Sequence, residues 1–422
     1  MKIKQVLCRR IWDSRGRPTV EVEVVNEDGT SGLGIAPAGA STGTREAVEL
    51  RDGGPRFKGL DVQDALRGIA SDITPALVGR DVTRQADIDA ALVALDGTPA
   101  KSRLGGNALI ATSLAVLHAA AAHARLPLWQ YLAQGRPVRL PLPQIQIFGG
   151  GAHAGRRVDV QDFMVIATGA TSFSQALEMT AEVYRAAGEL MASRGQLAGV
   201  ADEGGWWPSF ARNEEALDAL VASIEKAGFV PGQDVAIALD IAASEFGRAG
   251  RYRLALEGEE LDTDALCERL VRWTEAYPIV SIEDPLAEDD EAGLVAFTRA
   301  VGGRVQVVGD DYLVTHADRV RAAARVGACN CALIKPNQAG TVTETLAALE
   351  AAKAAGYATI VSARSGETED VAIVHLATGW NAGQLKVGSF ARSERMAKWN
   401  EGIRIESRAG APSGFAGRAA LA

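Results

Sequence analysis

Cysteine and lysine are both scarce in this chain, whose 422 residues include four cysteines and nine lysines. The cysteines show no Cys-x-x-Cys spacing, so neither a zinc site nor a disulfide framework is expected, and a reducing compartment fits. The net charge of −9 argues against a nucleic-acid-binding protein, which needs a basic surface to neutralise phosphates. Because lysine is rare, each lysine inside a motif carries more weight.

Long apolar stretches are also rare. Residues 108–124 lack Asp, Glu, Lys and Arg, but the segment is rich in alanine and contains His118 and His123. We therefore interpret it as a buried helix rather than a membrane span. Residues 1–4 lack the apolar core of a signal peptide. These features predict a cytoplasmic protein that binds neither membranes nor nucleic acids.

The length of the chain exceeds one ordinary hydrophobic core, so we expect two domains. Residues 19–25 alternate between apolar and polar side chains, and residues 26–29 supply a turn, which predicts a β-hairpin. Helical patterns follow to about residue 133. The proline-spaced segment 136–143 then predicts a linker, so we place the domain boundary between residues 135 and 136.

Short apolar segments recur from about residue 235 onward, and a charged or polar residue follows each of them. Positions 310, 335, 362 and 386 lie roughly 25 residues apart, which is enough for one strand, one helix and two loops. The pattern predicts successive βα units of an α/β barrel with a parallel sheet. Its strand-end charges are Asp240, Glu283, Asp310, Lys335 and Lys386.

Side chains at the carboxyl ends of barrel strands meet at one mouth, so we expect these five charges to converge. One such residue alone could equally be a helix cap or a solvated loop charge, but five in consecutive units favour a site. Three carboxylates suit a hard divalent cation, Mg²⁺ before Ca²⁺ or Mn²⁺. A lysine beside a dication is shifted toward its neutral form and can act as a general base. The expected chemistry is proton removal next to a carboxylate.

Several motifs together identify a family. They read DSRGRPTV, GASTG, DEGG, SIED, GDD, LIKPNQ and SGETED, beginning at residues 13, 39, 202, 281, 309, 333 and 365. These motifs closely resemble those of enolases, and they occur in the expected order from about residue 3 to residue 406. The resemblance implies an enolase-type (βα)8-like barrel over residues 136–406 and an N-terminal α+β capping domain with an active-site lid over residues 1–135. Residues 407–422 are expected to form a disordered tail.

The resemblance also implies roles for individual residues. Asp240, Glu283 and Asp310 would hold the first magnesium ion, and Ser41 on the lid would ligate a second. Lys335 would remove the C2 proton. Glu203, with Asp162 at the position of its partner residue, would help the C3 hydroxyl to leave. The substrate-binding set would comprise Arg45, His153, Gln161, Arg364, Ser365 and Lys386. The family further implies a homodimer or a larger homo-oligomer.

Four positions depart from the enolase pattern. Asp162 replaces a glutamate, Ala363 a histidine, Arg45 a lid histidine and Gly149 an asparagine. The shorter side chain at Asp162 moves its carboxylate by about 1.5 Å, and a misplacement near 1 Å can cost roughly 10²-fold in rate. We also expect Arg45, Arg156 and Arg157 to add positive charge around the anion pocket.

These departures favour a specialised paralogue over the glycolytic enzyme. The favoured hypothesis is an Mg²⁺-dependent carbon–oxygen lyase in phosphonate or phosphinate antibiotic biosynthesis, similar to carboxyphosphonoenolpyruvate synthase. Its substrate would be a small phosphorylated or phosphonylated carboxylic acid that resembles 2-phosphoglycerate. One alternative is an ordinary enolase that interconverts 2-phosphoglycerate and phosphoenolpyruvate. Another is a non-catalytic scaffold protein, which would need neither the lysine nor the metal ligands.

Overall fold

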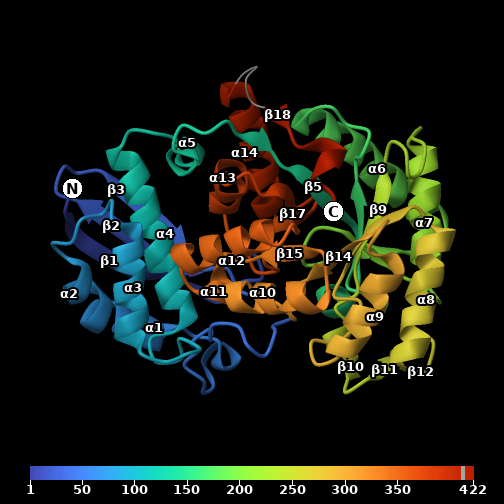
Figure 1. Cartoon of the computed structure of the whole chain (residues 1–422), viewed down its shortest axis with the longest axis horizontal. Helices are drawn as coiled ribbons and strands as arrows, with labels where there is room; N and C mark the ends of the chain where they lie inside the picture. The colour runs from blue at the N-terminus through green and yellow to red at the C-terminus, as the bar shows by residue number, and fades with distance from the viewer. Residues whose placement is uncertain (410–413) are drawn as a thin grey trace.

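The computed structural model describes residues 1–409 and 414–422, and it shows an N-terminal domain lying against one side of a larger barrel (Figure 1). The N-terminal domain has a three-stranded antiparallel sheet of β1 (Ile3–Trp12), β2 (Pro18–Asn26) and β3 (Ser31–Ile35). Its helices are α1 (Gln63–Gly68), α2 (Thr74–Leu77), α3 (Gln85–Asp96), α4 (Gly106–His123) and α5 (Leu128–Ala133). The predicted hairpin is confirmed as β2 and β3.

The uncharged segment 108–124 forms most of α4, which packs on the sheet as a buried helix. Two glycines of β3 make this contact possible. A Cβ atom at Gly32 or Gly34 would overlap the backbone of α4 at Ala119 or Ala111. Among the described residues, no helix is both long and apolar enough to cross a membrane.

Eight strands of the described chain close the barrel, in the order β17-β16-β15-β14-β13-β9-β6-β5 with β17 paired to β5. They are β5 (Leu142–Gly149), β6 (Asp162–Ile166), β9 (Ala236–Asp240), β13 (Ile279–Glu283), β14 (Gln306–Gly309), β15 (Cys331–Ile334), β16 (Ala358–Ser362) and β17 (Gly383–Ser389). Two short strands, β8 (Trp206–Pro208) and β7 (Leu197–Val200), extend the sheet beyond β5. The α/β barrel fold with its N-terminal α+β domain is thereby confirmed.

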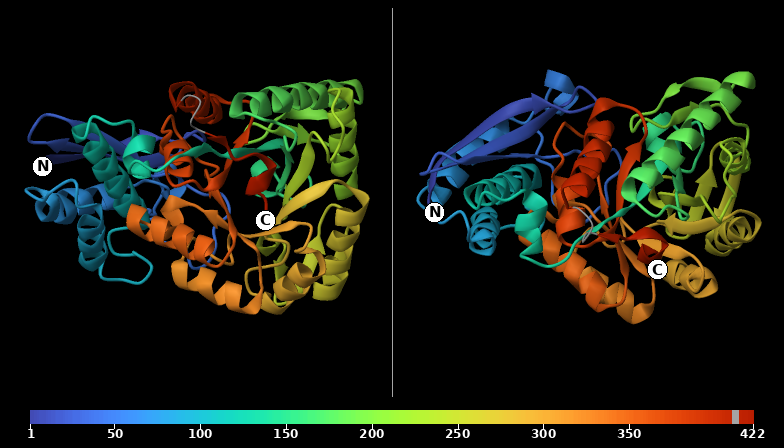
Figure 2. Two further views of the ribbon diagram at one scale, coloured as in Figure 1. Left: turned by 45° about the horizontal axis from the view of Figure 1, so that its top comes forward. Right: turned by 90° about the horizontal axis from the view of Figure 1, so that it is seen from above.

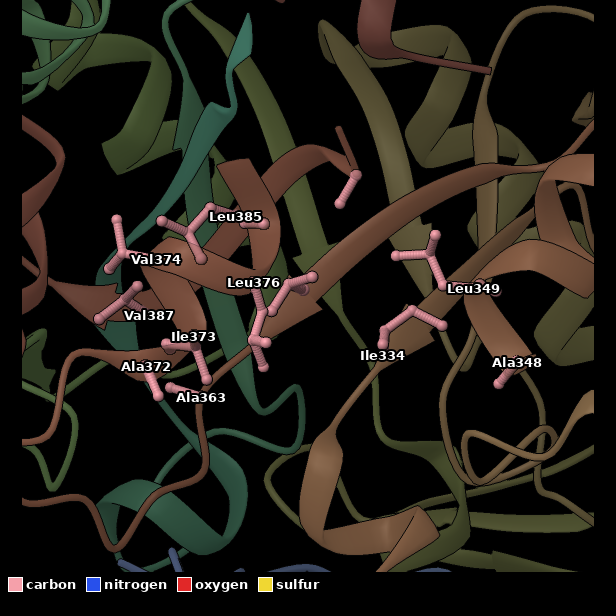
Figure 3. Packing of buried hydrophobic residues seen from close by; sticks show 14 of the residues in the cluster. Ile334, Ala348, Leu349, Ala363, Ala372, Ile373, Val374, Leu376, Leu385 and Val387 are labelled. Carbon is pink, nitrogen blue, oxygen red and sulfur yellow. The ribbon is translucent and has the colours of Figure 1, made fainter. Parts of the chain in front are cut away.

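Helices surround the barrel, as the two further views show (Figure 2). They are α6 (Phe173–Ser193), α7 (Asn213–Lys226), α8 (Thr263–Ala276), α9 (Glu291–Val301), α10 (Ala317–Val326), α12 (Val342–Ala354), α13 (Ala372–Gly379) and α14 (Ser393–Ala409), with α11 (Pro336–Ala339) as a short turn after β15. Their apolar side chains pack on the outer face of the strands; Leu349 of α12 and Val374 of α13 belong to this core (Figure 3).

One strand corrects the expectation of a parallel barrel. β6 runs antiparallel to both of its neighbours, β5 and β9. Parallel neighbours need a crossover of a dozen or more residues, usually a helix. The segment between β5 and β6 contains only a short 3-10 turn, Gly151–Ala154, so the chain returns beside β5 in the opposite direction.

The expectation of a disordered C-terminal tail was wrong. Helix α14 continues to Ala409, and β18 (Gly414–Phe415) pairs in parallel with β4 (Arg139–Leu140). Gln384 of β17 donates a hydrogen bond to the carbonyl of Ala420, and Phe415 packs on the apolar layer of Leu142. These C-terminal residues therefore pack against the barrel; residues 410–413 of the predicted tail lie outside the described residues.

Candidate active site

The predicted site residues other than Arg45 converge at one end of the barrel. They line one polar pocket at the barrel mouth. The predicted residues on its wall are Ser41, His153, Gln161, Asp162, Glu203, Asp240, Lys335, Arg364, Ser365 and Lys386. Glu283 and Asp310 are hydrogen-bonded to Lys386 and Lys335 respectively, so they belong to the same cluster.

The strands account for this convergence. β9 ends at Asp240 and β13 at Glu283, and the parallel register pairs these two residues. Asp310 and Lys335 come directly after β14 and β15. Lys386, which was expected at a strand end, lies inside β17, because the strand continues to Ser389.

Lys386 lies among three carboxylates. Its Nζ donates to Asp240 Oδ2 and to Glu283 Oε2, at 2.8 Å each, and lies 3.6 Å from Asp162 Oδ2. Burial lowers the pKa of Lys386, but the neighbouring carboxylates outweigh burial and raise it well above its usual value. The ammonium group thus occupies a position where the surrounding oxygens favour a cation.

The donor set fits a hard cation. Within the described residues, three buried oxygens at this position have no hydrogen-bond partner: Gln161 Oε1, Asp162 Oδ2 and Glu283 Oε1. Desolvation and the adjacent Asp240 raise the pKa of Glu283 well above its usual value, so this carboxylate gains from a further positive charge. Oxygen ligands of this kind suit Mg²⁺.

Lys335 is paired with Asp310. The three predicted metal ligands are therefore shared between two lysines, with Asp310 at Lys335 and the other two at Lys386. The Lys335 ammonium donates to Asp310 Oδ2, and Gln338 Nε2 donates to Asp310 Oδ1 at 2.8 Å. Burial lowers the pKa of Lys335, but the attraction of Asp310 raises it by more, so the pKa lies above its usual value. This direction is opposite to the shift that a neighbouring dication produces.

His153 lies between the two carboxylates predicted to act on the leaving group. Its Nδ1 is 3.0 Å from Asp162 Oδ1, and its Nε2 is 3.6 Å from Glu203 Oε1. Burial lowers the pKa of His153, but Glu203 and then Asp162 raise it to about 9. The imidazole is therefore protonated at neutral pH and joins Asp162 to Glu203.

Arg364 is held by residues 38–46, a segment that contains the predicted lid residue Ser41 and is called the lid from here on. Its guanidinium donates to Glu46 Oε2 at 2.8 Å and to the Ser41 carbonyl at 2.9 Å. Arg15 donates to the Ser365 hydroxyl and to the Ala38 carbonyl, which joins the same loop to the lid. Sequence reasoning missed Glu46 and Arg15, although both lie in or beside the quoted motifs.

A second set of residues that the sequence analysis missed supports the loop of Arg364 and Ser365 through its backbone carbonyls. Arg395 of α14 is fully buried and donates to the carbonyls of Arg364, Ser365 and Val387. Lys398, one turn later, donates to the Thr368 carbonyl at 3.0 Å. Their polar contacts inside an otherwise ordinary helical pattern gave no local signal in the sequence.

Three arginines contradict the expectation of extra charge around the pocket. Arg45 and Arg156 are exposed, and Arg156 pairs with Glu245 at 3.0 Å. Arg157 lies over the ring of Trp207, 5.1 Å from its centre. None of these arginines is among the described pocket-lining residues. The arginines lie on the surface, where water solvates them at little cost.

A capped α/β barrel whose mouth combines buried carboxylates with two lysines is an arrangement that suits an enzyme for metal-assisted proton removal. Comparison with known proteins narrows this class. The family model "Enolase, N-terminal domain" matches residues 3–132, and "Enolase, C-terminal TIM barrel domain" matches residues 137–422. The chain therefore belongs to the enolase family, whose members are carbon–oxygen lyases.

Two curated relatives match along the full length. "Enolase 1" of Desulfitobacterium hafniense (strain Y51) is 48% identical over 424 residues, covering 100% of this chain and 97% of the relative. The "Enolase" of Acidothermus cellulolyticus is 48% identical over 419 residues, covering 99% and 97% respectively. Both relatives are named enolase, so the comparisons favour an ordinary enolase over the specialised paralogue predicted from the departures.

Proposed function

We propose that this protein is an Mg²⁺-dependent enolase that interconverts 2-phosphoglycerate and phosphoenolpyruvate. The observation that carries the proposal is that Lys335, Glu203 and Lys386 line the same pocket as Arg364 and Ser365. One pocket thus combines a base, a leaving-group acid and cationic groups for two anions. The full-length similarity to two enolases supports the same reaction.

The metal would be held by Asp240, Glu283 and Asp310, with Ser41 of the lid at a second ion. When bound, Mg²⁺ supplies positive charge that stabilises the carboxylate after loss of the C2 proton. Lys335 removes that proton, and it must first lose the proton that Asp310 now stabilises. Lys386 binds the substrate carboxylate, and Arg364 with Ser365 binds the phosphate.

The leaving hydroxyl at C3 is served by Glu203 with its protonated neighbour His153. Protonation of a leaving group contributes roughly 10²- to 10⁴-fold to such reactions. Asp162 orients the imidazole through Nδ1 and keeps it charged. The aspartate therefore acts on Glu203 through the imidazole that lies between them.

A second candidate is a lyase acting on a bulkier phosphonylated acid. The observation in its favour is Ala363, whose small side chain lines the pocket and also belongs to the hydrophobic core (Figure 3). The surface positions of Arg45, Arg156 and Arg157 weaken this candidate, because they add no charge to the pocket wall.

The test is a direct assay of purified protein with 2-phosphoglycerate and Mg²⁺, which follows the ultraviolet absorbance of the enol product. We expect turnover that chelation of the metal abolishes and that Lys335→Ala eliminates. Lys353→Ala serves as the matched control, because Lys353 donates to the Trp380 carbonyl outside the pocket. Wild-type protein that binds Mg²⁺ without dehydrating 2-phosphoglycerate would contradict the proposal in favour of another acid.

A further inference from the structure

The side chain of Gln146 joins two parts of the leaving-group region. Gln146 lies on β5 and is 1% exposed. Its Nε2 donates to Asp162 Oδ1, and its Oε1 accepts the backbone N–H of Gly205 at 2.9 Å. A single carboxamide therefore connects the first residue of β6 with the loop that carries Glu203.

Gly205 leaves room for this carboxamide. A Cβ atom at Gly205 would overlap Gln146 Oε1. A Cβ atom at Gly149 would lie 2.6 Å from Ala201 Cβ and 3.4 Å from Gln146 Nε2. Real side chains essentially never approach as closely as the contact of Gly205 with Gln146 or that of Gly149 with Ala201, so a larger residue at position 205 would need the space of the Gln146 carboxamide.

Among the described residues, Asp162 has hydrogen-bond partners at one oxygen only, and its other oxygen lies 3.6 Å from Lys386 Nζ. Its Oδ1 accepts from Gln146 Nε2 and faces His153 Nδ1, while its Oδ2 has no hydrogen-bond partner among the described residues. Backbone pairing places Asp162 opposite Gly149 on β5, and the groups at Oδ1 together with the Lys386 ammonium at Oδ2 set the direction of its short side chain. The longer Gln146 reaches across to it.

We propose that Gln146 is a positioning residue, which sets Asp162 and hence His153 in place beside Glu203. The proposal rests on the proposed function, because it concerns departure of the C3 hydroxyl. Glutamine is one methylene longer than asparagine, and aspartate is one shorter than glutamate, a difference of about 1.5 Å in each case. The pair Gln146–Asp162 therefore spans the gap that an asparagine and a glutamate would also span.

The experiment moves one methylene between the two side chains. Gln146→Asn, Asp162→Glu and the double variant are compared with wild type for loss of water and for C2 proton exchange with deuterated solvent. Each single variant should slow water loss by about 10- to 100-fold and slow exchange much less. The double variant should return water loss to within about 5-fold of wild type, since the contact is restored with its methylene moved.

Gln144→Asn is the matched control, because Gln144 lies on the same strand, is 1% exposed and donates to Gln384 Oε1 at 2.8 Å. It should leave the ratio of exchange to water loss unchanged, and Asp162→Glu should not rescue it. If Gln146→Asn fails to fold, Gln146→Met takes its place, because it keeps the length of the side chain but loses both hydrogen bonds. It should slow water loss by the same factor. Equal losses of exchange and elimination, or additive effects in the double variant, would overturn the proposal.

The same four proteins separate this proposal from the proposed function. Wild-type protein without 2-phosphoglycerate turnover would contradict the proposed function alone. Urea unfolding midpoints then test the contact between Gln146 and Asp162. Mutual rescue in the double variant supports this contact, and additive shifts overturn the proposal.

Discussion

The carboxylate of Glu46 in the lid lies 2.8 Å from the guanidinium of Arg364 in the barrel, across 318 residues of sequence. Both side chains are buried, with 8% and 3% of their surfaces exposed. Burial lowers the pKa of Arg364, but Glu46 outweighs it and holds the arginine charged. The group predicted to bind the substrate phosphate is therefore already held by an acidic residue of the lid, so the lid and the phosphate site are coupled.

This coupling predicts separate effects on stability and activity. Arg364→Met leaves Glu46 as an unpaired buried charge and should lower the free energy of unfolding by about 3–5 kcal/mol. Adding Glu46→Gln should recover part of this stability but leave the KM for 2-phosphoglycerate raised by at least about 10-fold. Urea unfolding and steady-state kinetics measure the two effects. Arg84→Met, at an exposed pair with Asp87, is the control and should change stability by under about 1 kcal/mol.

The metal ligands give a second prediction. Asp240→Ala, Glu283→Ala and Asp310→Ala should each abolish Mg²⁺ binding at the first site, because each removes an oxygen ligand and leaves its strand intact. Titration calorimetry measures the affinity. Asp262→Ala is the control, since Asp262 caps α8 and should cost about 1 kcal/mol of stability without changing Mg²⁺ affinity. Unchanged affinity in all three site variants would place the metal elsewhere.

The base and the leaving-group acid should separate in isotope exchange. Lys335→Ala should eliminate exchange of the C2 proton with deuterated solvent, because it removes the proposed base. Glu203→Gln should slow the loss of water more than the exchange, because its role begins after proton removal. Nuclear magnetic resonance of the substrate follows both steps. Exchange that persists in the Lys335 variant would assign the base to another residue.

The sequence predicted those parts of the site that depend on local pattern. Asp240 and Glu283 each follow a short apolar segment, so strand and charge could be recognised together, and the structure confirms both strand ends. The barrel followed from the repetition of these segments. The antiparallel direction of β6 could not be predicted in this way, because a buried strand has the same apolar composition in either direction. Only the short connection from β5 determines the direction of β6.

Contacts between distant segments could not be predicted. Gln146 looks like any residue of a buried strand, and its importance appears only when β6 and the Gly205 loop come beside it. The C-terminal residues were expected to be disordered because their order comes from pairing with β4, far away in sequence. Arg45 was assigned to the pocket because the resemblance places it at a lid position usually held by histidine, although such a match does not determine the direction of a side chain.

The ionisation of His153 gives the last prediction. Burial lowers its pKa, but Glu203 and Asp162 raise it from 6.5 to about 9, so the folded protein binds this proton more tightly than the unfolded chain. The stabilisation is fully present below pH 6.5, and it is lost as the pH rises through about 9.

The comparison of wild type with His153→Gln isolates this contribution. The difference in their unfolding free energies should shrink by up to about 3 kcal/mol between pH 6.5 and pH 9.5, because only wild type loses the charged imidazole. Urea unfolding at several pH values measures the difference, and the His153 ring resonances should titrate near pH 9. Asp162→Asn removes one of the two carboxylates and should move that titration downward. A His153 resonance that titrates near pH 6.5 in wild type would show that the imidazole does not join Asp162 to Glu203 as a charged group.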